Sequence, residues 1–250
     1  FICLGFLVFW GLTSCGRPPL DSGSLLGASV DGRAAWTRMV KLESLKAAAI
    51  LSWRVTDGQH GKYKVRLFVE PPERLKIQWL TPWGSVAGQL LMGDDQFWFS
   101  DSRQRVTWHG QAVDFMSLFE QQENFDWAVA TQFFRYWPLL FSSPDDDDRR
   151  FGKQTFIDYL IADEGRSLSK IIRFASGEEM HIRLNDLEAV ADGRFLARNI
   201  EVLGRNGLIS LNLRKYTMLK ELAPENFIYN LKNFKIRECI AQEGDSYVGK

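Results

Sequence analysis

Apolar and polar side chains alternate along many short segments of this chain. Lys62–Leu67 reads charged, apolar, charged, apolar without exception, and Arg74–Trp79 repeats the alternation. A period of two is typical of a strand with one buried face. Further candidate strands, separated by turn residues, are Ala49–Val55, Val86–Met92, Gln96–Ser100, Arg105–His109, Thr155–Ile161, Leu168–Phe174, Met180–Leu184, Phe195–Leu203, Leu208–Tyr216 and Phe227–Leu231. Such short spacing leaves no room for crossover helices and predicts an antiparallel meander.

Two regions have helical periodicity instead. In Ala34–Leu45 the apolar residues recur at helical spacing, and Asp31 is placed to cap that helix. Residues 112–140 predict two short helices, the second ending before Pro138. The apolar positions of these three helices are Trp36, Met39 (or Val40) and Leu42 (or Glu43); Val113, Met116 and Phe119 (or Glu120); and Phe125, Val129, Phe133 and Tyr136, with Trp127, Ala130, Phe134 and Trp137 on an adjacent stripe.

These elements predict one mainly β domain with a few helices over residues 32–250. An antiparallel sheet of about ten or eleven strands is too wide to stay flat and tends to curl. We therefore expect an unclosed, curved antiparallel β-barrel, with the helices of residues 112–140 lying over its concave face as a lid. Such a lid would enclose an apolar cavity.

The N-terminal segment is of a different kind. Residues 1–15 form an uncharged apolar run that ends in Leu12-Thr13-Ser14-Cys15, a tetrapeptide that resembles the bacterial lipobox. The run is shorter than the roughly 20 residues of a membrane span and fits a signal-peptide hydrophobic region. Because it lacks an initiator Met and a basic segment, we expect the sequence to begin inside the signal peptide. We predict a signal peptide over 1–14, and a lipidated Cys15 followed by a flexible tether over 15–31; the alternative is a buried cysteine ending a core helix.

Cysteine content agrees with lipidation at Cys15. Cys3 would leave with the signal peptide, so Cys239 would be alone in the mature chain and no intramolecular disulfide could form. The stability of the fold would then come from its core.

Overall charge argues against a nucleic-acid partner. Lys plus Arg equals Asp plus Glu at 31 each, so no global field attracts a polyanion. Aromatic residues are frequent, with 9 Trp and 18 Phe, and require either a wide core or an apolar cavity.

Catalytic and metal-binding motifs are not apparent. His60, His109 and His181 are scattered, and no nucleophile-elbow, zinc-protease or phosphate-loop motif occurs. Asp145–Asp148 could hold calcium but lacks the spaced ligands and glycine of a dedicated loop, so a solvated loop is the preferred interpretation. We predict a protein that is not an enzyme and holds no cofactor or metal.

The order of elements resembles the LolA/LolB group of bacterial lipoprotein carriers. The resemblance is most specific in Leu80-Thr81-Pro82-Trp83-Gly84-Ser85-Val86, a strand, a Pro–hydrophobic–Gly–Ser loop and a strand. The tail Leu219–Phe227 is similar to the closing loop and strand of that group. The resemblance implies an unclosed barrel with a helical lid, whose cavity receives acyl chains of lipoproteins. It also implies that Trp83, larger than the aliphatic residue expected there, helps to deliver cargo into a membrane. Residues after Asn233 match nothing in the group.

Two sets of candidate site residues follow. Pro82, Trp83 and Gly84 form a membrane-inserting loop, or else Trp83 packs beneath a turn. The second set lines a hydrophobic ligand cavity, or else belongs to a close-packed core. It comprises Tyr63, Val65, Leu67, Leu75, Ile77, Trp79, Leu90, Phe97, Phe99, Phe133 and Trp137.

The predicted function is that of a lipid-anchored carrier or acceptor that binds acyl chains or lipoproteins and helps to localise them to the outer membrane. Its partners would be the membrane, the acylated cargo and a periplasmic carrier or envelope complex. Gly16 after the acylated cysteine favours the outer membrane, facing the periplasm, with the inner membrane as the alternative. A non-catalytic scaffolding lipoprotein is the second hypothesis, and a lipid hydrolase is the third.

Overall fold

A computed structural model describes most of the chain from Asp31 to Glu238. The described residues are 31–39, 41–55, 58–72, 74–93, 95–111, 115, 137–151, 155–163, 166–190, 193–204, 207–228 and 234–238. The helices and strands are α1 (Gly32–Thr37), β1 (Ser44–Val55), β2 (His60–Glu70), β3 (Arg74–Leu80), β4 (Val86–Gly93), β5 (Gln96–Asp101), β6 (Val106–Gln111), η3 (Trp137–Leu140), α4 (Pro144–Phe151), β7 (Phe156–Ala162), β8 (Ser167–Arg173), β9 (Glu179–Ala189), β10 (Phe195–Gly204), β11 (Gly207–Leu219), η7 (Pro224–Phe227) and β12 (Lys235–Glu238).

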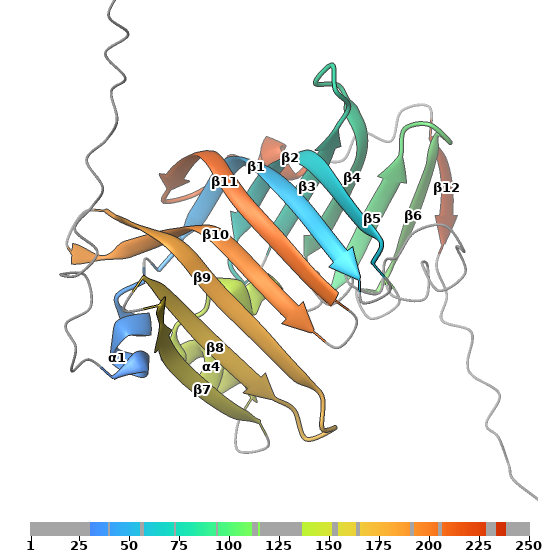
Figure 1. Cartoon of the computed structure of the whole chain (residues 1–250). Helices are drawn as coiled ribbons and strands as arrows, with labels where there is room; N and C mark the ends of the chain where they lie inside the picture. The colour runs from blue at the N-terminus through green and yellow to red at the C-terminus, as the bar shows by residue number, and fades with distance from the viewer. Residues whose placement is uncertain are drawn as a thin grey trace, which may run out of the picture.

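All strands of the described residues form one curved sheet (Figure 1). Its order is β12-β6-β5-β4-β3-β2-β1-β11-β10-β9-β8-β7, so two meanders join where β1 pairs with β11. β7 and β12 lie at opposite edges, and the sheet is therefore unclosed. The predicted fold class is confirmed, with 12 strands in place of about ten or eleven.

The two faces of the sheet follow the alternation in the sequence. On β2, Val65 and Leu67 are buried, whereas Lys62, Lys64 and Arg66 are exposed. Cross-strand register carries this polarity onward, because Val65 pairs with Trp79 and Leu67 with Ile77. Cross-strand neighbours on one face share its environment, so the apolar core collects on one side of the sheet. We call that side the inner face.

The leading helix is shorter than the sequence predicts. α1 ends at Thr37, and the Asp31 side chain caps it by accepting the backbone N–H of Arg33 at 3.3 Å. The predicted continuation to Leu45 is wrong, since β1 begins at Ser44 and pairs with both β2 and β11. Two ladders of backbone hydrogen bonds outweigh the weak helical preference of the segment.

The predicted solvated loop of four aspartates is also wrong. Residues 144–151 form α4, and Asp147 is buried. Acidic side chains stabilise the first turn of a helix, because its free N–H groups carry partial positive charge. Figure 1 shows α1 and α4 on the same side of the sheet, next to β7 and β8.

Most of the predicted lid lies outside the described residues. Within residues 112–140, Phe115 packs against Phe97, with ring centroids 4.9 Å apart. Trp137, expected at the end of the second helix, instead begins η3. Phe133 lies outside the described residues.

The C-terminal strand is displaced from its predicted place. The structure has η7 at Pro224–Phe227 where the sequence predicts a strand starting at Phe227, so that prediction is wrong at its first residue. The last strand is β12, which pairs in parallel with β6 in a segment that the sequence left unassigned.

Burial explains why Phe227 leaves the sheet. Leu222 and Phe227 form a second apolar cluster with Phe68 on the outer face, separate from the inner core. Polar contacts hold the segment there: Lys76 Nζ donates to the Ile228 carbonyl at 2.9 Å, and the Leu222 N–H donates to Glu70 Oε1 at 2.7 Å. The chain thus crosses the outer face before it reaches the β6 edge.

Candidate functional site

A cavity lies where β3 ends before its neighbour does. The β2–β3 ladder ends at the pair Lys64–Leu80, while β2 extends four residues further, to His60. β4 is irregular at the same level, where the register shifts between Trp79 and Leu80. The resulting notch belongs to a cavity of about 1030 Å³, bounded by β2 to β6 and by the turns after β3 and β5.

Aromatic rings line the inner part of this cavity. Tyr63, Trp79, Phe99 and Trp108 contribute to its wall. The Phe99 ring stands edge-on to Trp79 at 6.0 Å and stacks on Trp108 at 5.7 Å between centroids. These contacts fix the ring positions while leaving apolar surface facing the cavity.

A glycine sets the width of the wall between β4 and β5. A Cβ at Gly88 would lie 2.9 Å from the Ser100 carbonyl oxygen, a distance at which the backbone would have to shift. Gly88 therefore allows β5 to approach and brings Phe99 beside Trp79.

The cavity residues predicted from sequence divide into two groups. Tyr63, Trp79 and Phe99 line the cavity. The others that the structure describes belong to the close-packed inner core: Val65, Leu67, Leu75, Ile77, Leu90, Phe97 and Trp137. Six of these seven are at most 1% exposed, which leaves no surface for a ligand. Sequence reasoning missed Trp108, although Val106 and Trp108 have the same alternation.

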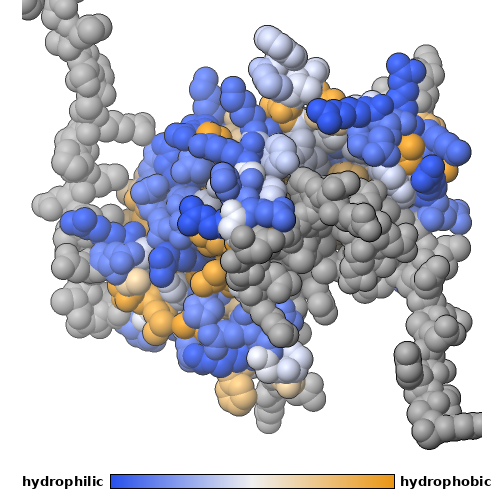
Figure 2. Space-filling model, turned by 45° about the vertical axis from the view of Figure 1, so that its right-hand side comes forward, coloured by the Kyte–Doolittle hydropathy of each residue, from blue (hydrophilic) through white to orange (hydrophobic). Residues whose placement is uncertain are grey.

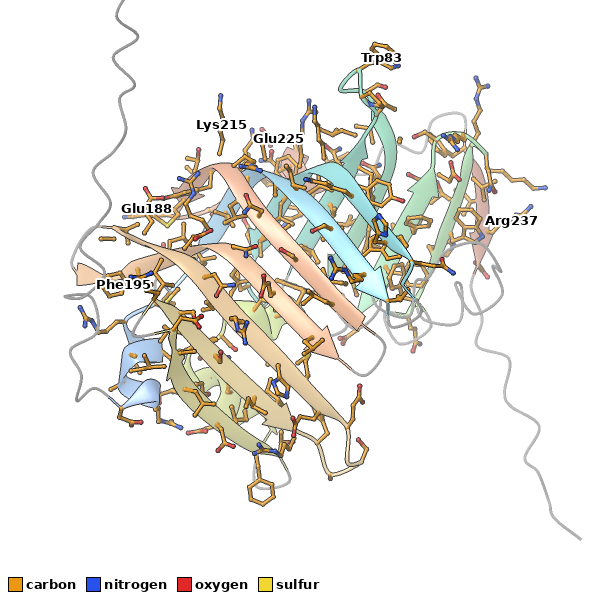
Figure 3. All side chains as sticks on the ribbon, in the orientation of Figure 1. Trp83, Glu188, Phe195, Lys215, Glu225 and Arg237 are labelled. Carbon is orange, nitrogen blue, oxygen red and sulfur yellow. The ribbon has the colours of Figure 1, made fainter. Side chains whose placement is uncertain are left out.

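The loop after β3 is a rigid hairpin turn with an exposed tip. The Thr81 N–H donates to the Ser85 carbonyl at 2.8 Å, and the Gly84 N–H donates to the Thr81 carbonyl at 2.9 Å. Gly84 has a φ of +83°, in the left-handed region that favours glycine. Trp83 is 92% exposed and does not pack beneath the turn. Figure 3 shows it projecting from the tip of the β3–β4 hairpin.

Charged residues also border the cavity. Lys62, Lys64, Asp101 and Arg103 are among its lining residues. The Asp101 carboxylate is engaged locally, because Oδ1 accepts the backbone N–H groups of Arg103 at 2.7 Å and of Gln104 at 3.3 Å. Figure 2 shows one side of the molecule, where most of the coloured surface is hydrophilic and the apolar areas are smaller. The cavity therefore combines an aromatic wall with a charged border.

The half of the sheet that contains β7 and β8 has a buried ion pair on its inner face. Lys170, on the inner face of β8, contacts Asp147 of α4 at 2.6 Å between Nζ and Oδ2, and both side chains are fully buried. Lys170 Nζ also donates to the Leu139 carbonyl at 3.1 Å and to Ser142 Oγ at 3.1 Å. Burial lowers the pKa of Lys170, and the Asp147 carboxylate opposes that shift.

The remaining contacts of Asp147 complete this cluster. The Tyr159 hydroxyl donates to Asp147 Oδ2 at 2.7 Å, and the Ser142 hydroxyl donates to Oδ1. Burial and the Asp147 carboxylate raise the pKa of Tyr159 far above its usual value, so its phenol remains a donor. Because a buried charge is costly unless it is hydrogen-bonded, this network fastens η3 and α4 to the sheet. Both charged side chains of the network are fully buried.

Neither region resembles a metal centre. Among the described residues no group of three or more His, Cys, Asp or Glu side chains could hold a metal ion. The cavity lining that the structure describes includes serines and threonine but no histidine. In the described part of the chain, no helix is both long and apolar enough to cross a membrane.

Comparisons with solved structures give similar strand arrangements at low sequence identity. A LolA superfamily protein of Nitrosomonas europaea is 11% identical, with 80% of this chain and 99% of that chain covered and a TM-score of 0.47. A putative outer membrane lipoprotein-sorting protein domain of Vibrio parahaemolyticus is 12% identical, with 78% and 92% covered and a TM-score of 0.48. A DUF1329 family protein of Desulfovibrio piger is 10% identical, with 79% and 95% covered and a TM-score of 0.48.

The first of these structures belongs to the group that the sequence resembles. No protein-family model matches the sequence, and no curated protein does.

Proposed function

We propose that this protein is a carrier or acceptor that holds the acyl chain of a lipid or lipoprotein in the cavity between β2 and β6. The supporting observation is the cavity itself, about 1030 Å³ and walled by Tyr63, Trp79, Phe99 and Trp108, beside the apolar core of the sheet. Ligand pockets typically have volumes of roughly 300–1,000 Å³ and mostly apolar linings, so this one can admit a long hydrocarbon chain.

Burial of an acyl chain in the cavity supplies enough free energy for reversible binding. Burying about 300 Å² of acyl surface contributes roughly 7 kcal/mol at about 25 cal/mol per Å². Association opposes this with a cost of about 4 kcal/mol or more, so the net affinity is moderate. A moderate affinity suits a protein that must release its ligand, and transfer would then proceed down an affinity gradient without nucleotide.

The proposal places the protein at a membrane through its N-terminus. Cys15 would carry the lipid anchor after removal of residues 1–14, and residues 15–31 would connect it to the sheet. The anchor would hold the protein on the periplasmic face of the outer membrane, where it helps to localise its cargo. A periplasmic carrier or an envelope complex would be its partner, and a scaffolding role in such a complex is the alternative function.

The loop of Pro82, Trp83 and Gly84 would contact the membrane during release. Thr81, Pro82 and Ser85 line the cavity, so the loop carrying Trp83 is part of its border. Trp favours the interface between water and lipid, because its ring is apolar and its N–H is polar. An exposed Trp on a rigid turn can therefore insert at the headgroup level and bring the cavity to the bilayer.

Blocking the cavity tests the carrier function. We expect Ala87→Trp, at a lining position of β4, to weaken binding of the neutral probe N-phenylnaphthylamine at least tenfold, measured by fluorescence titration of the chain carrying Cys15→Ser. Ala48→Trp, at an exposed position of β1, is the matched control and should leave binding unchanged. If the parent protein binds neither this probe nor any acyl species seen by native mass spectrometry, the carrier proposal fails and scaffolding becomes the preferred function.

Removing the exposed Trp tests the loop. Trp83→Ser should reduce binding of the Cys15→Ser chain to phospholipid vesicles about three- to tenfold in a sedimentation assay, since one interfacial aromatic is lost. The thermal midpoint should not change, because Trp83 is 92% exposed. Phe156→Ser, which removes an exposed aromatic side chain from edge strand β7, is the control. Equal vesicle binding by both variants and the parent would refute this role for Trp83.

A further inference from the structure

Two arginines of the sheet are paired with carboxylates of neighbouring strands. On the outer face of β8, Arg173 lies between Asp158 of β7 and Glu179 of β9 and pairs with both. Arg198 of β10 likewise pairs with Glu188 of β9 at 3.2 Å. Cross-strand pairing of opposite charges thus compensates these two arginines.

Such pairing does not occur at the basic residues that the structure describes beside the cavity. Lys62 and Lys64 of β2 have Ser52 and Ile50 as their cross-strand neighbours on β1, and Lys64 has Leu80 on β3. Within the described part of the chain, no side-chain hydrogen bond or ion pair engages Lys62, Lys64 or Arg103. The nearby Asp101 carboxylate is occupied by backbone N–H groups.

This local excess is not imposed by composition. The chain as a whole has equal numbers of acidic and basic residues, 31 each. Lys62, Lys64 and Arg103 nevertheless border the cavity with one carboxylate, that of Asp101, among its lining residues. Neighbouring like charges without a counter-charge repel each other. A bound ligand of opposite charge would offset that repulsion.

We infer that the ligand of the cavity is an anionic amphiphile, whose alkyl chain lies among the aromatic rings and whose carboxylate or phosphate head is held by Lys62 and Lys64. This inference rests on the proposed function and narrows it to anionic ligands. A ligand with an uncharged head group would gain no binding energy from the charges of the two lysines. Lys62 and Lys64 lie on the part of β2 at the notch, where β2 extends past β3, and both are among the residues that line the cavity. A head group there would remain partly hydrated while its alkyl chain enters the cavity. Long cationic side chains suit this position, because they cover apolar surface while their charged ends stay in water.

Matched ligands with one palmitoyl chain test the inference in the Cys15→Ser protein at pH 8. The anionic probes are palmitate and palmitoyl lysophosphatidate, and the neutral probe is 1-monopalmitoylglycerol. We expect the double variant Lys62→Gln/Lys64→Gln to weaken binding of both anions about 5- to 20-fold, as for two partly exposed charge contacts. Binding of the neutral probe should change less than twofold. Raising NaCl from 0.05 to 0.5 M should weaken anion binding by the parent but not by the double variant.

Lys46→Gln/Lys215→Gln is the control. Lys46 of β1 and Lys215 of β11 are both exposed, and neither lines the cavity. It should leave all three affinities unchanged. Inorganic phosphate alone should neither bind measurably nor displace palmitate, because the chain supplies most of the free energy; phosphate binding as tight as that of lysophosphatidate would overturn the inference.

Two failures are distinguishable in the same titrations. If the neutral and anionic probes bind equally and the lysine variants change nothing, the charge inference is refuted and the carrier function stands. If no probe binds the parent protein, the carrier function itself is refuted.

Discussion

The two meanders of this sheet share an alternating pattern of apolar and polar residues, but their inner faces are covered differently. At β7 and β8 the inner face is covered by α1, η3 and α4 and is filled by the Lys170–Asp147 pair. At β2 to β6 the inner face ends in aromatic rings around a cavity of about 1030 Å³. The comparison shows that the strands supply an apolar surface, and the segments laid on that surface decide whether it becomes a core or a binding site.

Close backbone approach makes the β7–β8 half compact. A Cβ at Gly32 would lie 2.1 Å from the Tyr159 carbonyl oxygen, so α1 begins directly against the backbone of β7. The Trp36 indole N–H then donates to the Ser142 carbonyl at 3.1 Å, and the Lys170 ammonium lies 4.6 Å from the centroid of the same indole. Segments distant in sequence thus meet around one charge, an arrangement that gives rigidity and leaves no room for a ligand.

The largest expected effect is the loss of this charge pair. Lys170→Met should lower the free energy of unfolding by about 3–5 kcal/mol, because the Asp147 carboxylate would stay buried without its partner. Urea unfolding followed by circular dichroism measures it. Lys215→Met, an exposed lysine of β11, is the control and should change stability by less than about 0.5 kcal/mol.

Removing both charges sharpens that prediction. Lys170→Met/Asp147→Leu should recover part of the loss, since no unpaired charge remains. A single variant as stable as the parent protein would show that the pair does not fasten α4.

The next prediction compares the loss of stability when an aromatic residue is removed from the core and from the cavity wall. Phe97 is fully buried and Phe99 lines the cavity, although they stand two residues apart on β5. Phe97→Ala should destabilise the protein by about 3–5 kcal/mol. Phe99→Ala should cost roughly 1–2 kcal/mol, because part of its surface already faces open space, and it alone should change the affinity for palmitate. Calorimetric midpoints and ligand titrations provide the two measurements; equal losses of stability would contradict the assignment of Phe99 to a cavity wall.

The smallest effect concerns the start of α4. Ser143 and Asp146 form a capping box: the Ser143 hydroxyl donates to Asp146 Oδ2 at 2.6 Å, and the Asp146 N–H donates to Ser143 Oγ at 3.3 Å. The Ser143 hydroxyl lowers the pKa of Asp146 below its ordinary value of 3.8. A lowered carboxyl pKa contributes stability that is present above the unfolded-state pKa and is lost as the pH falls through the folded-state pKa.

Asp146→Asn should therefore destabilise the protein by about 1 kcal/mol at pH 7 and flatten the loss of stability between about pH 4 and pH 2. Urea unfolding at a series of pH values measures both. Asp145→Asn is the control, because Asp145 is an exposed residue of the same turn whose carboxylate contacts Arg33 at 3.5 Å rather than Ser143. An unchanged pH profile in the Asp146 variant would show that this carboxylate does not support α4.

Local patterns in the sequence determined the strands, the faces of the sheet and several turns. Alternation over Lys62–Leu67 and Arg74–Trp79 placed β2 and β3, because side chains on a strand point to opposite faces whatever the rest of the chain does. The sequence predicted the cap at Asp31 and a turn at Pro82–Gly84, since caps and tight turns depend on a few neighbouring residues, whereas the exposure of Trp83 was decided by the structure.

Contacts between distant segments decided what local patterns could not. The run Asp145–Asp148 became a docked helix because Lys170, remote in sequence, required a buried carboxylate. The tail crossed the outer face because Phe68 and Phe227 bury each other there, and so β12 reached β6.

The cavity is the clearest case. The sequence marked Val65, Tyr63, Phe97 and Phe99 alike as inward residues, and the tertiary structure divided them. β3 ends at Leu80 while β2 continues, and beside that notch Tyr63 and Phe99 are partly buried and line the cavity, whereas Val65 and Phe97 are buried in the core. A period of two tells which side chains face inward; only the lengths, register and covering of neighbouring strands decide what they meet there.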